Sequence, residues 1–516
     1  MGPTFRASLN GLHTWAGVVL GGLLFAIFWM GTLSVFDREI DLWMQPGTRL
    51  ASGQPVSVDA VAGELKPLIG GASQWFMRFP TDREPAVRVG YRGTGGPFVQ
   101  RHLDPATLRL LPETGTLAGT GFIFPFHYSL NIRNWLLGYW VVGLAGMAML
   151  ALCVSGVVIH RKIFTEFFTF RADKKPRRLV LDLHNVSGVL GLPFHFIISL
   201  SGLIIFFSIY FPSTTELAYG GDPRSFNREV FGIYGRPKAN LPATAAVSLD
   251  GLVREASRRW EGERPFFVRV WYPGDANSYV EMRRPYDGAV TMNLDLVYFD
   301  AVTGAVLHTF TAAPVLTVQR FVSGLHFIQF RHWTLRWVYF GLGLSGCLLI
   351  ATGYLFWLES RRTRHRQLGL PGVRIVEGLA VGSVTGIVVA TLAFFVANRL
   401  LPPGATFLGE ERAALEVWTF YIVWVATFAH AWLRPGRAWI EQSCTTAGLA
   451  VAAVILNWLT TGHHLGKSLA ADHLRAVAGM DLLLLATAAI AVWAARRLAR
   501  KARRRAATTP GPSIAL

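Results

Sequence analysis

The chain has 516 residues, of which 52% are hydrophobic and only 16% are charged, and it contains 17 Trp and 35 Phe. A soluble domain of this size does not carry such an apolar excess, so the composition excludes a soluble protein and indicates a polytopic α-helical membrane protein. The net charge of +18 does not indicate a nucleic-acid partner, because the basic residues gather beside the apolar segments, where the positive-inside rule explains them.

Eight apolar segments are long enough to cross a lipid bilayer, which requires about 20 residues. They cover approximately residues 12–36, 136–159, 184–210, 337–358, 376–398, 413–433, 439–460 and 477–497. Five basic clusters fall on one side of the membrane if these spans alternate: residues 161–162, 174–178, 361–366, 434–437 and 496–505. This pattern predicts a multi-pass membrane protein, with both termini in the cytoplasm and the two long loops, 37–135 and 211–336, outside.

An internal duplication organises much of the chain. Segment 12–36 (LHTWAGVVLGGLLFAIFWMGTLSVF) matches segment 183–207 (LHNVSGVLGLPFHFIISLSGLIIFF) at a constant offset of 171 residues. Four pairs hold this register: His13 with His184, Gly17 with Gly188, Gly31 with Gly202, and Phe36 with Phe207. The register indicates a duplicated unit.

The two outer loops repeat as well, since each reads as a helix followed by strands. The first has a predicted helix at 57–68 and strands at 75–79, 86–92 and 99–111; the second has a helix at 248–260 and strands at 266–272, 278–283 and 296–310. The sequence therefore predicts two small α+β modules outside the membrane, each between two spans.

The predicted domains follow from this repeat. Residues 1–165 form the first repeat, 166–182 a basic cytoplasmic loop, 183–365 the second repeat, 366–498 a block of four helices without an outer module, and 499–516 a basic cytoplasmic tail. Cys153, Cys347 and Cys444 all lie within spans, which predicts free thiols and excludes a disulfide framework.

Histidines are the candidate functional residues. His184 and His195 are eleven residues apart on one predicted helix, so they share a face and lie about 16 Å apart along its axis. Imidazoles are costly in hydrocarbon and normally face a bundle interior, which makes the pair a functional hypothesis. Six histidines fall into two layers: His13, His160 and His184 toward the cytoplasm, and His127, His195 and His326 toward the outside.

A six-coordinate b-type haem needs two imidazoles on opposing helices, with small residues beside them for the macrocycle. Five glycines are candidates for that space: Gly17, Gly21, Gly22, Gly188 and Gly191. The alternative for each histidine is an imidazole that simply satisfies a helix contact by hydrogen bonding. An unbroken helix from His160 would place His127 about 50 Å away, so His127 must lie in the headgroup region or on a bent segment.

Zinc is the competing metal, but structural zinc favours close Cys and His spacings, which are absent from the sequence. Four arginines near the outer layer are candidates to pair with haem propionates or to attract an anionic ligand: Arg133, Arg320, Arg331 and Arg336. Their alternative role is ordinary anchoring at the membrane interface.

Two stretches carry a resemblance to a known family: SGVVIHRKIFTEFFTFR, at 155–171, and LDLHNVSGVLGLPFHFIISLSGL, at 181–203. Together they resemble the PepSY-associated transmembrane family, in particular its iron-uptake branch of inner-membrane ferric-siderophore reductases, which is ferrioxamine-reductase-like. The likeness covers roughly residues 8–365. It implies a protein with two haem b groups that passes electrons across the inner membrane and reduces Fe(III) of a siderophore in the periplasm. The haem ligands that it implies are the six histidines of the two layers.

The sequence-based hypothesis is therefore a haem b pair. We expect His184 with His13 or His160 to bind the inner haem, and His195 with His127 or His326 to bind the outer one. Electrons would enter from a cytoplasmic reductase or a quinol and leave to the ferric siderophore. The alternatives are a non-redox PepSY membrane scaffold and a permease for the siderophore or for iron. A permease should carry intramembrane charges or broken helices, at which only Pro193 and His195 hint.

Overall fold

The computed structural model describes residues 4–507 apart from residues 52, 54, 94, 133 and 161–175. The chain divides into two compact units. The helical unit comprises Met1–Met44, Gly115–Leu200 and Trp337–Leu516, and the sheet unit comprises Gln45–Thr114 and Ser201–Arg336. Most of the predicted basic loop 166–182 lies outside the described residues, as does the end of the predicted tail from residue 508 onward.

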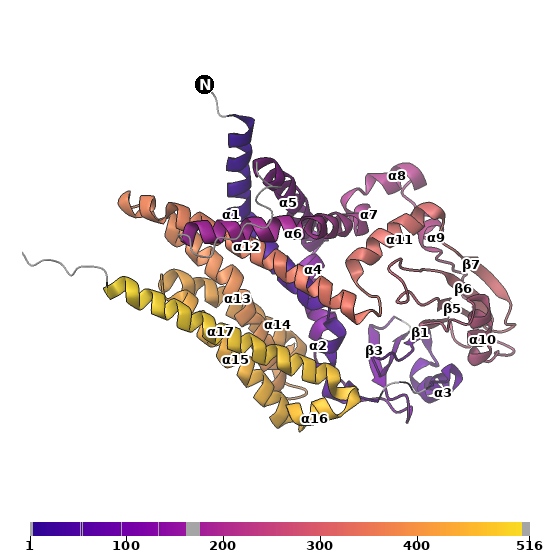
Figure 1. The fold of residues 1–516 in the computed structure, drawn as a ribbon. Helices are drawn as coiled ribbons and strands as arrows, with labels where there is room; N and C mark the ends of the chain where they lie inside the picture. The colour runs from indigo at the N-terminus through magenta and orange to yellow at the C-terminus, as the bar shows by residue number, and fades with distance from the viewer. Residues whose placement is uncertain are drawn as a thin grey trace, which may run out of the picture. The chain divides into compact units, whose positions relative to one another are not determined.

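Eight helices in the described part of the chain are long and apolar enough to cross a membrane, which confirms the polytopic helical fold. They are α1 (Phe5–Ser34), α5 (Leu137–Ile159), α6 (Pro176–Ile205), α12 (Trp333–Gln367), α13 (Gly372–Leu400), α14 (Arg412–Leu433), α15 (Ala438–Thr461) and α17 (Arg475–Ala507) (Figure 1). The last of these extends into the predicted tail, because the basic residues from 499 onward continue the helix.

The four C-terminal spans, orange to yellow in Figure 1, pack closely on one another and on α1 through α13. Small residues make this packing possible, since Gly378, Gly382 and Gly386 recur every fourth residue on α13. A Cβ atom at Gly382 would lie 2.3 Å from the Phe428 ring of α14. The glycines therefore let the two backbones approach closely, as small residues do between membrane helices.

Shorter elements connect the spans of the helical unit. They are α2 (Asp37–Met44), the π-helix η2 (Gly119–Ile123), α4 (Phe124–Ser129), the hairpin strands β8 (Thr406–Phe407) and β9 (Glu410–Glu411), α16 (Leu465–Ala470) and the 3-10 helix η3 (Asp472–Leu474). The sequence pattern did not predict α2, η2 or α4 as separate elements.

The sheet unit contains one antiparallel sheet of seven strands in the order β3-β2-β1-β4-β5-β6-β7. The first loop supplies β1 (Ala72–Arg78), β2 (Val87–Gly93) and β3 (Phe98–Leu103), and the second supplies β4 (Phe267–Trp271), β5 (Tyr279–Arg283), β6 (Leu296–Asp300) and β7 (Val306–Phe310). Both predicted modules contribute strands to this sheet, and the pairing of β1 with β4 joins them into one sheet, which the sequence pattern did not predict. Pairing these strands hides the two edges that separate modules would expose.

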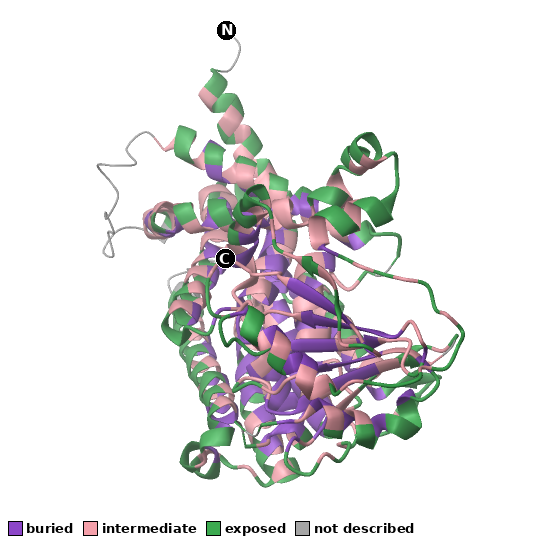
Figure 2. Cartoon of the chain, turned by 90° about the vertical axis from the view of Figure 1, so that its right-hand side faces the viewer, coloured by how far each residue is buried: buried purple, intermediate pink, exposed green. Residues whose placement is uncertain are grey.

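One face of this sheet carries the apolar core. Alternate strand residues such as Trp75, Met77 and Val268 pack against α3 (Val58–Ile69) and α10 (Leu249–Arg259), and the strands appear as buried in Figure 2. These two helices were predicted at nearly the same positions. The remaining elements of this unit are η1 (Pro46–Thr48), α7 (Phe207–Tyr210), α8 (Ser213–Tyr219), α9 (Pro223–Phe231) and α11 (Pro314–Phe327).

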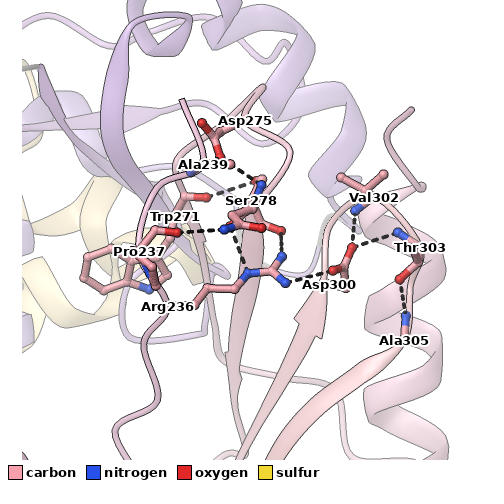
Figure 3. Close-up of polar contacts among 11 residues, drawn as sticks. Arg236, Pro237, Ala239, Trp271, Asp275, Ser278, Asp300, Val302, Thr303 and Ala305 are labelled. Atoms are coloured by element: carbon pink, nitrogen blue, oxygen red, sulfur yellow. Dashed lines mark hydrogen bonds and ion pairs between the residues drawn. The ribbon is translucent and has the colours of Figure 1, made fainter. Parts of the chain in front are cut away.

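Buried polar groups fix the loops of the second module. The Arg236 guanidinium donates to the Asp300 carboxylate at 3.0 Å and to the Ser278 carbonyl at 2.7 Å (Figure 3). Asp300 in turn accepts from the backbone N–H groups of Val302 and Thr303, both at 2.8 Å. Arg236 therefore fastens the segment before α10 to the sheet.

The duplication is visible in the way α3 and α10 cap each other. Asp59 in the first turn of α3 accepts from the Leu249 backbone N–H at 2.7 Å, and Asp250 in the first turn of α10 accepts from the Val58 backbone N–H at 2.8 Å. A carboxylate at a helix N-terminus satisfies unpaired N–H groups and complements the helix dipole. Each module helix thus depends on a side chain from the other module.

We predict that Asp59→Ala and Asp250→Ala each lower the free energy of unfolding of the sheet unit by about 1–2 kcal/mol, the usual cost of a lost N-cap. Amide hydrogen exchange of the full-length protein should show faster exchange in α3 and α10 together for either variant. Glu64→Ala, an exposed position on α3, is the matched control and should change exchange little. Faster exchange confined to one helix would contradict the reciprocal cap.

Candidate functional site

Two histidines at corresponding positions of the repeats lie in the helical unit, His13 on α1 and His184 on α6. The Nδ1 atom of His184 lies 2.9 Å from the Leu349 carbonyl oxygen. A carbonyl can only accept, so Nδ1 carries the hydrogen. The Nδ1 atom of His13 lies 2.8 Å from the Ser155 hydroxyl oxygen, whose own hydrogen is donated to the Leu152 carbonyl. Both neutral imidazoles therefore keep the lone pair on Nε2, a nitrogen that can bind a metal.

The partners of these histidines form the same short motif in each repeat. The ring of His13 lies against Leu152, Ser155 and Gly156 of α5, within the sequence LCVSG. The ring of His184 lies against Leu349, Thr352 and Gly353 of α12, within the sequence LIATG. The Cε1 atom of His13 lies 3.5 Å from the position of a Cβ at Gly156, and that of His184 lies 3.3 Å from one at Gly353. Each ring thus rests on a glycine of the facing helix. A search for this repeat, at an offset of 197 residues, would have found these partners in the sequence.

The structure brings His13 and His184 together, since the two imidazoles lie close enough to interact electrostatically. His160, the other inner candidate, ends α5 and donates its backbone N–H to the Gly156 carbonyl at 3.0 Å. Its Nδ1 atom is buried without a hydrogen-bond partner among the residues that the structure describes. Of the two expected partners for His184, His13 is the one that influences it electrostatically.

His127 lies on α4, which folds back against the end of α1. Its Nδ1 atom donates to the Ile27 carbonyl at 2.9 Å, and a Cβ at Gly31 would lie 2.6 Å from its Cε1 atom. The reversal occurs at Leu130 and Asn131, which both adopt the left-handed conformation. The bent segment is therefore the correct alternative. Gly31 is 18 residues from His13, which places His127 about 27 Å from the inner layer along α1.

His326 has the corresponding position in the second repeat, within the sheet unit. It lies on α11, its Nδ1 atom is 3.1 Å from the Ser201 hydroxyl, and a Cβ at Gly202 would lie 2.8 Å from its Cε1 atom. Gly202 is the residue that matches Gly31 in the duplicated register. The second repeat therefore also separates its two histidine layers by 18 residues of one helix, or about 27 Å.

His195 is held differently. It is fully buried, and its Nε2 atom lies 3.1 Å from the Ser345 hydroxyl oxygen, whose hydrogen goes to the Leu342 carbonyl. Nε2 therefore carries the hydrogen, and Nδ1 has the lone pair. That Nδ1 atom is buried and has no hydrogen-bond partner within the described part of the chain. If His195 binds a metal, it does so through Nδ1, unlike His13 and His184. Its partners on α12 belong to a third copy of the motif, LGLSG.

The glycines that we expected to leave room beside the histidines differ in how much open space lies next to them. No atom lies within 4 Å of a Cβ placed at Gly17, one turn from His13. Gly21 and Gly22 are instead in contact with Tyr354 and Ser383, and Gly191 is covered by the His195 ring. The structure therefore leaves open space at Gly17 but fills the other three positions with protein side chains. At Gly188, Leu349 lies 3.2 Å from the Cβ position, so that side chain would have to move.

Three of the four candidate arginines are described, and Arg133 lies outside the described residues. Arg331 is exposed and donates to Asp287 at 2.7 Å, a hydrogen bond that raises its pKa. The Arg320 guanidinium lies over the Phe231 ring at 5.3 Å, and burial lowers its pKa. Arg336 is fully buried, with its guanidinium 4.9 Å from the Trp333 ring. Of these three described arginines, Arg331 is the one that is exposed enough to meet a soluble anion without rearrangement.

No group of three or more His, Cys, Asp or Glu side chains that could hold a metal ion occurs among the described residues. The donors here are imidazoles from separate helices, two of which lie close enough to interact electrostatically. Such a donor set suits the two axial positions of a haem better than the closed tetrahedral shell of zinc.

Residues 11–360 match the model of the PepSY-associated TM region. The chain belongs to this family. It is also similar to an uncharacterized protein of Pseudomonas aeruginosa, PA4219, with 27% identity over 377 residues that cover 70% of this chain and 91% of the relative. The family match ends before α13, so the four C-terminal helices lie outside it.

We predict opposite tautomers for the histidines of this site. In haem-free protein with ¹⁵N-labelled histidine, the NMR spectrum should show His13, His127 and His184 protonated on Nδ1, and His195 protonated on Nε2, since each hydrogen faces a fixed acceptor. Ser345→Ala is the diagnostic variant and should perturb the His195 signals alone. Protonation of His195 on Nδ1 in the unmodified protein would contradict the assignment.

Proposed function

We propose that this protein is a two-haem membrane reductase that carries single electrons across a bacterial inner membrane to the ferric iron of a siderophore in the periplasm. The observation that supports the proposal best is the pairing of His13 with His184. The two imidazoles come from corresponding helices of a duplicated unit and lie close enough to interact electrostatically, and both keep the Nε2 lone pair. Bis-histidine haem ligation requires two such imidazoles.

The residues fit a haem in three respects. The acceptors Ser155 and Leu349 fix the ring orientation of the inner pair, as hydrogen bonds behind a metal-binding histidine do. The open space at Gly17 lies on the same helix face as His13, one turn away. The surrounding helices are apolar and exclude water. When bound, haem would supply the one-electron Fe(III)/Fe(II) couple, and the protein supplies ligands, spacing and dielectric.

We propose that His195 with His127 or His326 binds the outer haem, as the sequence suggested. His127 and His326 are the equivalent residues of the two repeats, and His127 already has the tautomer needed for ligation through Nε2. The layers are about 27 Å apart along α1, close to the 30 Å thickness of a hydrocarbon core. Two cofactors at these depths would divide the crossing into two shorter electron transfers. Each electron reduces one Fe(III) to Fe(II), which hard oxygen ligands hold more weakly.

The proposed orientation follows the positive-inside rule, with both termini in the cytoplasm. A cytoplasmic reductase or a quinol would supply electrons, and the sheet unit would face the periplasm with the substrate. The competing proposals are a permease and a non-redox scaffold. A permease would be favoured by a broken helix at a midplane site, but α6 runs through Pro193 without interruption.

We predict that purified protein contains two b-type haems and that His13→Ala or His184→Ala lowers this to one, because removal of either ligand abolishes bis-histidine binding of the inner haem. The pyridine haemochrome assay measures the content. His473→Ala, an exposed residue of η3, is the matched control and should retain both haems. A colourless preparation would exclude the proposed function and favour the permease or the scaffold.

Electron transfer can be tested in sealed proteoliposomes with a reductant trapped inside and a ferric siderophore outside. We expect Fe(II) to appear outside, detected by a membrane-impermeant Fe(II) chelator, and His184→Ala to reduce the rate at least about tenfold, since the inner step is lost. The same rate for His184→Ala and for unmodified protein would contradict the transmembrane route.

A further inference from the structure

We propose that the four C-terminal helices serve to position α4, and with it His127, for the outer haem. The role in haem binding rests on the proposed function, whereas the contacts that hold α4 are independent of it. It assigns the roles of positioning residues to Thr116, Asp41, Glu416 and Tyr421. Thr116 belongs to segment 116–130, which carries His127, and the other three residues hold this segment; none of the four contacts the histidine ring in the described hydrogen bonds.

Aromatic packing forms the first part of the contact. Phe122 of η2 and Phe126 of α4 are fully buried. The Phe122 ring centre lies 4.8 Å from that of Phe394 on α13 and 5.2 Å from that of Phe420 on α14. Phe126 lies 5.6 Å from the same Phe420 ring. The face of α4 opposite α1 is therefore covered by the C-terminal helices.

Hydrogen bonds fix both ends of the segment to α14. At its start, the Thr116 hydroxyl donates to the Glu416 carboxylate. At its end, the Tyr421 hydroxyl donates to the Leu130 carbonyl at 2.8 Å, at the residue where the chain reverses. Glu416 is fully buried and is itself held by Asn398 at 2.9 Å and by Arg412 at 3.2 Å. A buried carboxylate with this many partners has a fixed position, so it can fix Thr116.

Asp41 of α2 holds the N-terminus of the same segment. Its carboxylate accepts from the backbone N–H groups of Gly119 at 2.8 Å and Thr120 at 3.0 Å, and from the Thr120 hydroxyl at 2.6 Å. A Cβ at Gly119 would lie 2.4 Å from the Asp37 carbonyl, so only glycine allows this approach.

The C-terminal helices hold α2 as well. Trp43 of α2 donates its indole N–H to Asp481 of α17 at 2.8 Å, and Arg399 of α13 lies over the Trp43 ring at 5.2 Å. Arg399 also donates to the Met44 carbonyl at 2.5 Å. The buried charges of the C-terminal block are thus paired with one another and with the elements that carry His127.

The second repeat does not need such a block, because its own module supports the equivalent helix. Gly324 of α11 lies directly against the Val290 carbonyl, and the Arg320 carbonyl accepts from the Met292 N–H at 3.4 Å. His326 is therefore positioned by a loop of the sheet unit. In the first repeat the C-terminal helices, which lie beyond the family match, perform this task for His127.

The test uses full-length holoprotein and the double variant Thr116→Val/Tyr421→Phe, which removes both end bonds with little change of shape. Electron paramagnetic resonance and a redox titration report the two haems separately. We expect full haem content, a shifted g-value and midpoint potential for one haem, and an unchanged second haem. Restoring Tyr421 alone should recover part of the shift.

Two variants of the same block are the matched controls. Thr419→Val removes a hydroxyl whose hydrogen bond, within the described part of the chain, stays inside α14 and goes to the Leu415 carbonyl at 2.8 Å. Glu441→Gln lies at the other end of the block, where Glu441 pairs with His430 at 2.8 Å. Both should leave both haems unchanged. Unchanged haems in the double variant, or equal shifts in both haems, would overturn the proposal.

Amide hydrogen exchange provides a readout that does not need haem. The double variant should exchange faster at residues 122–130 and not in α15. A protein without haem would refute the proposed function alone, and faster exchange in this segment would then still support the positioning role. Unchanged exchange would refute it whatever the haem content.

Discussion

The structure depends on the need to provide an acceptor for the N–H group of each imidazole inside a membrane. Each buried ring must direct its N–H to an acceptor, because an unpaired polar group in an apolar medium is costly. His184 uses the Leu349 carbonyl, His13 uses the Ser155 hydroxyl, and His127 uses the Ile27 carbonyl. In each case the choice of acceptor determines which nitrogen keeps its lone pair. A local hydrogen bond thus determines whether a ring is ready to bind a metal.

The duplication provides two copies of this arrangement, and the two copies differ in the elements that support the outer histidines. The inner pair is symmetric in its motif, since LCVSG and LIATG receive His13 and His184 in the same way. The outer histidines have equivalent glycines beneath them but different supports behind them. His195 occurs only in the second repeat, because Leu24 occupies the corresponding position of the first. It has the opposite tautomer, so its chemistry need not match that of the others.

Much of this was predictable from the sequence. The eight spans follow from hydropathy, and the offset of 171 residues identifies the corresponding histidines and glycines. The bend before α5 was only one of two alternatives, because the left-handed residues there are Leu130 and Asn131 and no glycine marks them. The pairing of β1 with β4 was not predicted, because the alternation of apolar and polar residues in a strand does not specify which other strand it pairs with. The bonds of Tyr421 and Glu416 to segment 116–130 also escaped prediction, because they connect residues about 300 positions apart.

The pairing of β1 with β4 bears on the origin of the chain. These are the leading strands of the two modules, and they run antiparallel, with Phe76 opposite Arg269. The same strand in a half-length ancestor would meet its own copy with two-fold symmetry, as isologous dimers do. Gene fusion would then have turned an association between subunits into a contact within one polypeptide. Divergence of the two halves after such a fusion would explain why the C-terminal helices support α4 of the first repeat, whereas the sheet unit supports α11 of the second.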